Sequence, residues 1–370
     1  MSRAGGEGCE VQLELEPAEN PAISAVMFSA GLLGNLTALA LLLARRRRRR
    51  RGGRPLSLFY LLVTALVLTD LLGTCLVSPV VLAAYGRRRT LVALAEGRRL
   101  CLYFAFAMSF FGLATLLVLF AMALERCLAL ARPYLYERLV RRRSALLALA
   151  ALYAFAAAFC ALPLLGFGRY AQYCPGTWCF IQMRLGRTAA GDGDGDGDAT
   201  YSLLYASLLL LLVLAVLLCN LSVIGSLLAM HRRAQTSRRL ASSLVQQQQP
   251  GTAAAGRRRL SLSEEMDYLI LLSVMTITFM VCFLPFTIHA YMNKFGHNDN
   301  SKGYMDLLAL RFLSINPIID PWIFVILRPP VLRVIRSVLC CQMSLKTQDN
   351  IQTPAPAKSK SDKQIDLCGQ

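Results

Sequence analysis

The sequence contains an arginine inside a long apolar run. Arg311 lies about seven residues into the apolar stretch 304–327, hence roughly 10 Å along a helix at 1.5 Å per residue. An unpaired guanidinium in hydrocarbon is costly, so its position needs a reason. One interpretation is that Arg311 forms a bidentate pair with the carboxylate of a ligand. The structural alternative is a pair with Asp306, or a side chain that extends to the membrane interface.

Two carboxylates lie in other apolar runs and form a second candidate set. Asp70 and Asp320 are both predicted on the same side of mid-membrane, where Asn35 and Asn316 can join them. A buried carboxylate needs a cation, a proton or polar partners. A hydrated cation site and a structural polar network both satisfy this need, and the sequence favours neither.

Nothing in the sequence indicates a cofactor, a metal or a catalytic group. The 12 cysteines include no CxxC spacing, and the three histidines (His231, His289 and His297) are predicted far apart. Hydrolytic metals and nucleophiles require clustered ligands or bases. We therefore expect no cofactor and no enzymatic activity.

Long apolar runs must position these residues. The chain has 370 residues, 55% of them hydrophobic and 17% charged, and a mean hydropathy of +0.47. A helix needs about 20 apolar residues to cross a bilayer. Seven stretches qualify, so we predict an all-α membrane protein with a seven-helix bundle at 21–327. The spans are 21–44, 56–85, 100–130, 144–168, 200–230, 268–292 and 304–327.

The basic residues predict the orientation and explain the net charge of +18. Loops on one side of the membrane carry 20 Arg, including all of 45–51, whereas the other side carries 11 basic residues. The positive-inside rule then makes residues 1–20 extracellular and the carboxyl terminus cytoplasmic. Because the arginines lie in these loops, we expect membrane lipid rather than nucleic acid as their partner.

Cysteines at the predicted outer side can form a disulfide. Cys101 begins the third span, and Cys174 and Cys179 lie in the following outer loop. The oxidising exterior permits a bond. We favour Cys101–Cys179, which leaves Cys9 and Cys174 as a second candidate pair. Trp178 in the same loop is either part of a lid over the bundle or an interfacial anchor.

The region after the last span is predicted to lie on the membrane surface. Residues 328–341 form an amphipathic stretch that ends in Cys340 and Cys341, a pattern typical of palmitoylation. Two unmodified cytosolic thiols are the alternative. The Lys-, Ser- and Pro-rich tail 342–370 is predicted to be disordered.

Several motifs together resemble a known family. Gly34-Asn35, Asp70, Glu125-Arg126 and Pro285 are similar to the signatures of rhodopsin-like G-protein-coupled receptors. The stretches 172–180, 311–314 and 320–322 resemble prostanoid receptors more specifically, and the similarity runs from about residue 21 to 348. By composition alone, Glu125 and Arg126 could be ordinary interfacial charges.

The resemblance implies a receptor in the plasma membrane for a fatty-acid-derived ligand. It implies prostaglandin E2, with prostaglandin D2 or prostacyclin as alternatives, and a stimulatory G protein that raises cyclic AMP. Arrestin and receptor kinases are further candidate partners. Glu125 and Arg126 would serve coupling. The ligand residues would be Arg311, Tyr85 and Thr177 at the carboxylate, with Met27, Met108, Phe111, Ser314 and Trp178 along the rest of the ligand.

The sixth span departs from the usual pattern of the family. The sixth span reads Cys282-Phe-Leu-Pro285, where most rhodopsin-like receptors have a Trp before the Leu, so the usual aromatic switch is in doubt.

A transporter or channel is the alternative of another class. It requires a polar path and often internal repeats, and the two halves of this chain do not resemble each other.

Overall fold

The computed structural model of the protein describes residues 13–15, 20–52, 57–139, 141–183, 195–244, 252–295 and 302–326. The predicted surface helix 328–341, its Cys340 and Cys341, and the tail 342–370 lie outside the described residues. Most of the predicted amino-terminal segment 1–20 lies outside them too.

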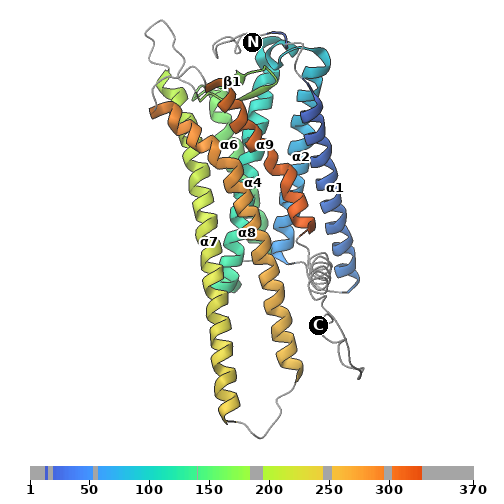
Figure 1. The fold of residues 1–370 in the computed structure, drawn as a ribbon, viewed down its shortest axis with the longest axis vertical. Helices are drawn as coiled ribbons and strands as arrows, with labels where there is room; N and C mark the ends of the chain where they lie inside the picture. Colours follow the sequence, from blue (N-terminus) through green and yellow to red (C-terminus); the bar gives the residue numbers. More distant parts are fainter. Residues whose placement is uncertain are drawn as a thin grey trace, which may run out of the picture.

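The described part of the chain is a bundle of long helices with one short hairpin at one end (Figure 1). The elements are α1 (Ala22–Arg51), α2 (Leu58–Arg87), α3 (Leu91–Leu94), η1 (Glu96–Arg98), α4 (Arg99–Ala131), α5 (Pro133–Leu139), α6 (Arg142–Ala161), η2 (Leu162–Leu165), β1 (Tyr170–Tyr173), β2 (Trp178–Ile181), α7 (Gly195–Leu244), α8 (Thr252–Phe295) and α9 (Lys302–Ile326).

Seven of these helical segments are long and apolar enough to cross a membrane. They reproduce the seven-helix architecture predicted from the apolar runs. The span Arg143–Leu165 shows why the surrounding solvent is lipid: only 11% of its apolar window is buried inside the protein. So large an exposed apolar surface does not occur on a soluble monomer.

The helices α1 and α7 extend past their apolar runs. The sequence places residues 45–51 in a loop, whereas α1 continues as a helix through Arg51. Arginine is a good helix former, and the basic last turn complements the negative end of the helix dipole. For the same reason the polar, basic sequence beyond Met230 does not end α7, which reaches Leu244.

Close contact between α1 and α9 depends on a glycine. A β-carbon added at Gly34 would lie 2.8 Å from Nε1 of Trp322. The adjacent Asn35 is buried, and its Nδ2 donates to the carbonyls of Gly31 and Pro317, both at 3.0 Å. The Gly34-Asn35 motif therefore joins the first span to the last, and fixes α9 with its Arg311 and Ser314.

A two-stranded antiparallel hairpin covers one end of the bundle. Strand β1 pairs with β2 in the register Tyr170↔Ile181 to Tyr173↔Trp178. Gly176 turns the chain with φ of +102°, and a β-carbon there would lie 2.4 Å from Cγ2 of Thr90. This hairpin was not predicted from the sequence. We call the end that carries it the hairpin end, and the other the opposite end.

Candidate functional site

A cavity opens between the helices beneath the hairpin. Its wall comes from α1, α2, α4 and α9, with one residue each from β2 and α8. The lining is largely apolar with a few hydroxyls. It consists of Ser24, Met27, Asp70, Gly73, Thr74, Val77, Ser78, Val81, Met108, Phe111, Gly112, Thr115, Trp178, Phe283, Leu313, Ser314, Asn316, Pro317 and Ile318.

Five of the residues predicted to contact a ligand line this cavity: Met27, Met108, Phe111, Trp178 and Ser314. They come from four elements far apart in the sequence. Two flexible thioethers and two aromatic rings suit a long, bent apolar ligand. The structure therefore brings these five side chains to one concave surface.

The other three predicted ligand residues do not line the cavity but lie beside it. Each is close in sequence to a lining residue: Tyr85 is one turn beyond Val81, Thr177 precedes Trp178, and Arg311 is one turn before Ser314. Along their elements, Tyr85, Thr177 and Arg311 thus lie nearer the hairpin end than the neighbouring residues that line the cavity.

Two of these polar groups have no partner among the described residues. The Arg311 side chain is half-buried, and no described carboxylate lies within ion-pairing distance of it. The Thr177 side chain is fully buried, and its Oγ1 forms no hydrogen bond. The side chain of Asp306, the structural alternative for Arg311, lies outside the described part. A cation and a buried donor at the mouth can together bind a carboxylate.

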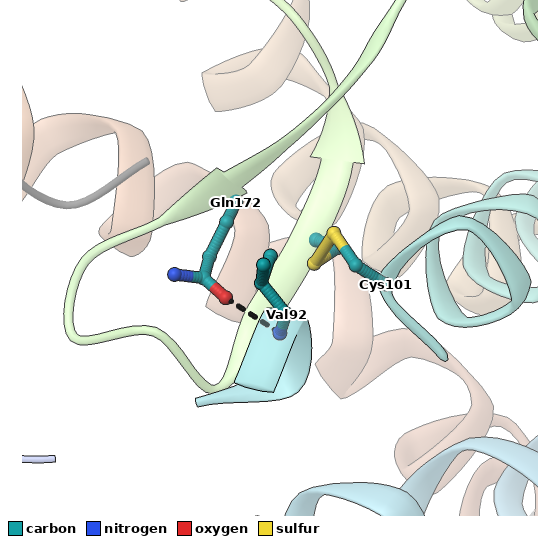
Figure 2. The surroundings of a disulfide bond; sticks show 4 residues. Val92, Cys101 and Gln172 are labelled. Carbon is teal, nitrogen blue, oxygen red and sulfur yellow. Dashed lines mark hydrogen bonds between the residues drawn. A yellow bond between two sulfur atoms is a disulfide. The ribbon is translucent and has the colours of Figure 1, made fainter. Parts of the chain in front are cut away.

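A disulfide fixes the hairpin over the cavity. Cys101 at the start of α4 is bonded to Cys179 of β2, as predicted, with Cα atoms 5.4 Å apart. Figure 2 shows the bond beside a hydrogen bond of 3.0 Å from the Val92 amide to Oε1 of Gln172. Cys174 is disulfide-bonded too. The pairing with Cys9 predicted from the sequence involves a residue outside the described range.

Tyrosine hydroxyls fix the hairpin internally and against the helices. The Tyr173 hydroxyl donates to the Ile181 carbonyl at 2.7 Å and accepts from the Met183 amide at 3.1 Å. The Tyr170 hydroxyl donates to the Cys160 carbonyl at 2.7 Å. Burial raises the pKa of Tyr170 above its ordinary value, so this donor stays protonated. Trp178 is consequently held on a rigid lid.

Two of the four residues in the predicted polar set, Asp70 and Asn316, line the cavity. Oδ1 of Asp70 accepts from the Thr115 hydroxyl at 2.9 Å, and Oδ2 of Asp320 accepts from the Asn316 amide at 2.8 Å. The second oxygen of each carboxylate and the amide oxygens of Asn35 and Asn316 are buried with no partner among the described residues. Both interpretations of this set, cation site and structural network, remain compatible with the geometry.

An ion pair occupies the opposite end of α4. Glu125 and Arg126 form two hydrogen bonds, of 2.5 Å and 2.6 Å, and both residues are buried. The Tyr136 hydroxyl donates to the same carboxylate at 2.9 Å. The Arg126 guanidinium also lies 4.9 Å from the centre of the Phe59 ring. These are not ordinary interfacial charges, because neighbouring groups hold the arginine against its own helix.

Sequence reasoning missed one aromatic cluster. Phe180 of β2, Tyr205 of α7 and Phe286 of α8 contact one another edge to face. Each lies in an apolar stretch of ordinary composition, so no motif indicated that they meet. The position of Phe180, next to Cys179, was the available signal that it points into the bundle.

Comparisons with known proteins agree with the architecture and the cavity. The model of the 7 transmembrane receptor (rhodopsin family) matches residues 34–324. The chain is 58% identical over 365 residues to the human prostaglandin E2 receptor EP2 subtype, covering 98% of this chain and 97% of that protein. It is 46% identical to the human prostaglandin D2 receptor, covering 88% and 91%, and 45% identical to the human prostacyclin receptor, covering 90% and 79%.

A solved structure also shares the fold. Squid rhodopsin superposes with a TM-score of 0.66, covering 91% of each chain, at 15% sequence identity. That likeness concerns the arrangement of the helices alone.

Proposed function

Because this chain belongs to the rhodopsin family of seven-transmembrane receptors, and within it to the prostanoid receptors, we propose that it is a receptor for prostaglandin E2. Near-full-length similarity to receptors named for that ligand carries the proposal. Prostaglandin D2 and prostacyclin are the alternatives, since receptors named for them are also similar. Agonist binding would activate the stimulatory G protein and raise cyclic AMP.

The cavity supports a specific placement of the ligand. The carboxylate would pair with Arg311 at the mouth and accept hydrogen bonds from Tyr85 and Thr177. A planar guanidinium can bind both carboxylate oxygens at once. The hydrocarbon chains would fill the apolar body of the cavity between Met108 and Phe111. One half-buried cation without a described partner matches one acidic headgroup.

The other polar and apolar neighbours would complete this placement. Ser314 lines the cavity and its hydroxyl donates to the Arg311 carbonyl at 2.8 Å, which leaves its oxygen able to accept from a ligand hydroxyl. Met27 closes the side formed by α1, and Trp178 covers the cavity from the hairpin.

The orientation follows from the same proposal. The hairpin end would face outside the cell, since its disulfides require an oxidising compartment, and the opposite end would face the cytoplasm. In the plasma membrane, the G protein would then meet Arg126 after the pair with Glu125 separates. Arrestin and receptor kinases would approach from the same side. The segment 328–341, with Cys340 and Cys341 palmitoylated, would lie on that membrane surface.

The experiment is cyclic AMP accumulation in cells that express the chain, with the three prostanoids compared on the wild type and on Arg311→Ala. A hydrogen bond to a charged group contributes about 1.5–3 kcal/mol, so we expect Arg311→Ala to raise the half-maximal prostaglandin E2 concentration by about tenfold to 150-fold. Arg99→Ala is the matched control, because Arg99 is exposed at the hairpin end.

A neutral methyl ester of prostaglandin E2 makes the test specific for the carboxylate. On the wild type, the ester should be less potent than the acid. The Arg311→Ala substitution should not weaken the ester further, since the ester carries no charge for Arg311 to bind. Equal potency of the acid on wild type and Arg311→Ala would show that Arg311 is structural. If the chain reaches the cell surface and no prostanoid raises cyclic AMP, the proposed ligand and coupling are wrong.

A further inference from the structure

The outer face of α1 is apolar and exposed along the whole span. Figure 1 shows α1 at the edge of the bundle. The opposite face of the helix packs inwards. The exposed large side chains are Ile23, Val26, Leu33, Leu36 and Leu43, and the buried residues are Gly31, Gly34, Asn35, Ala38 and Leu42. The exposed face is the one that meets lipid.

This division continues into the arginines that end the helix. Arg45, Arg46 and Arg49 are half-buried and extend the inward face below Leu42. The exposed arginines are Arg47, Arg48, Arg50 and Arg51. The seven arginines are therefore not equivalent, because helical periodicity places them on different faces of α1.

Two of the exposed arginines lie directly below Leu36 and Leu43, the large side chains of the exposed face that are nearest to the arginines. At about 100° per residue, Arg47 is turned about 40° and Arg50 about 20° from Leu43. Arg48 is turned about 140° from Leu43 and lies away from Leu36 and Leu43. At 1.5 Å per residue, Arg47 and Arg50 lie about 6 Å and 10 Å beyond Leu43 along the helix axis.

That depth is the level of lipid headgroups. The polar regions add roughly 5–8 Å on each side of the hydrocarbon core. No carboxylate of a described residue lies within ion-pairing distance of Arg47 or Arg50. A guanidinium binds phosphate oxygens in pairs, and residues three apart on a helix are neighbours. Two adjacent cations at phosphate depth, below an apolar stripe that contacts acyl chains, match a lipid with a strongly anionic headgroup.

We propose that Arg47 and Arg50 form a binding site for an anionic phospholipid, with the headgroup phosphates on the two guanidiniums and the acyl chains along Leu43 and Leu36. Arg51, about 80° from Leu43, lies at the edge of this site. In the proposed orientation the site faces the cytoplasmic leaflet, which is the anionic one. The site is separate from the cavity, which α1 lines through Ser24 and Met27 near its other end.

The test measures binding of fluorescent phosphatidylinositol bisphosphate to the purified full-length protein in neutral detergent micelles. Two variants that each remove two positive charges from the opposite end are compared. They are Arg47→Gln/Arg50→Gln at the site, and Arg48→Gln/Arg138→Gln, whose residues are exposed but outside the site. Glutamine has nearly the helix propensity of arginine, so α1 should remain intact. Prostanoid binding to the cavity verifies that both variants are folded.

We expect the site variant to bind the lipid about tenfold more weakly or worse, and the control variant to change by less than about threefold. Unlabelled phosphatidylserine should compete, whereas phosphatidylcholine should not. An equal loss of lipid affinity in both variants would mean that the lipid is attracted by the net positive charge and not by a site at Arg47 and Arg50. Unchanged binding in the site variant would overturn the proposal. Equally strong competition by soluble inositol trisphosphate would identify a phosphate site that does not recognise a lipid.

Discussion

Phe180 of β2 and Phe286 of α8 meet edge to face, with ring centroids 5.4 Å apart and planes at 89°. Tyr205 of α7 contacts both rings, with centroids 6.0 Å and 5.9 Å away. Phe180 lies next to Cys179 and two residues from Trp178 along the chain, and Phe286 follows Pro285 in α8. The lid over the cavity is thus packed directly on the two helices that extend furthest at the opposite end.

This contact predicts a loss of stability in Phe180→Leu. Leucine keeps an apolar side chain but removes two edge-to-face contacts, each contributing about 0.5–1.5 kcal/mol. We expect a destabilisation of about 1–3 kcal/mol, measured as a lower Tm of the purified protein in detergent. Phe155→Leu is the control, because Phe155 is 46% exposed on α6 and stacks on Phe159. If Phe155→Leu lowered the Tm as much as Phe180→Leu, the effect would come from a general loss of aromatic surface and not from this contact.

The ion pair at the opposite end predicts a graded change in basal signalling. Glu125→Gln removes the charge that holds Arg126, whereas Tyr136→Phe removes a single hydrogen bond to the same carboxylate. Glu125→Gln weakens both bonds to Arg126, whereas Tyr136→Phe leaves the ion pair in place. A bond to a charged group contributes about 1.5–3 kcal/mol, and about 1.4 kcal/mol is tenfold in a conformational equilibrium. Basal cyclic AMP should therefore rise strongly in Glu125→Gln and slightly in Tyr136→Phe.

Surface expression must be matched between these variants before basal signalling is compared. Tyr134→Phe serves as the control, because Tyr134 lies in the same short helix and is 90% exposed. If Glu125→Gln leaves basal signalling at the wild-type level, the pair does not restrain Arg126.

The architecture followed from the sequence because length and hydropathy are local properties. The apolar runs located the spans, and Cys101 with Cys179 located the outer loop over the bundle, although not its hairpin. Helix ends were less predictable. Arg45 to Arg51 are polar and yet helical, because a helix can continue into water when its residues favour that conformation.

Only those site residues could be predicted whose type is unusual for their place in the sequence. Arg311 stood out as a charge in an apolar run, and Trp178 as one of two tryptophans. Phe286 and Tyr205 did not, because their importance lies in a contact between distant segments. The sequence also could not show that Asp70 and Asn316 belong both to the polar network and to the cavity floor. That overlap follows from the packing of α2 against α9.

The polar network predicts a dependence on sodium. Four buried oxygens without a described partner, on Asp70, Asp320, Asn316 and Asn35, suit a hard cation better than a closed hydrogen-bond network. We expect the Tm of the wild type to be higher in sodium chloride than in choline chloride at equal ionic strength. Sodium at 100 times its Kd would stabilise the folded protein by about 2.7 kcal/mol. Asp70→Asn should abolish the difference between the two salts.

A variant of the same size separates this effect from general screening. Thr69→Val removes a hydroxyl that bonds to Tyr153 and to the Ala65 carbonyl and to none of the four residues, so its sodium response should match the wild type. If the wild type has the same Tm in both salts, the four residues form a structural network and no cation site.

The hydroxyl of Thr177 predicts opposite effects on stability and on ligand affinity. It is buried without a partner among the described residues, and a buried unsatisfied hydroxyl costs about 1–3 kcal/mol. Thr177→Val keeps the shape and removes that cost, so the Tm of the unliganded protein should rise. Prostaglandin E2 should bind about tenfold more weakly, because its carboxylate loses a donor. Thr177→Ser retains the hydroxyl and should retain affinity. A fall in both Tm and affinity in Thr177→Val, with both restored in Thr177→Ser, would instead mean that the hydroxyl supports the hairpin itself and does not bind the ligand.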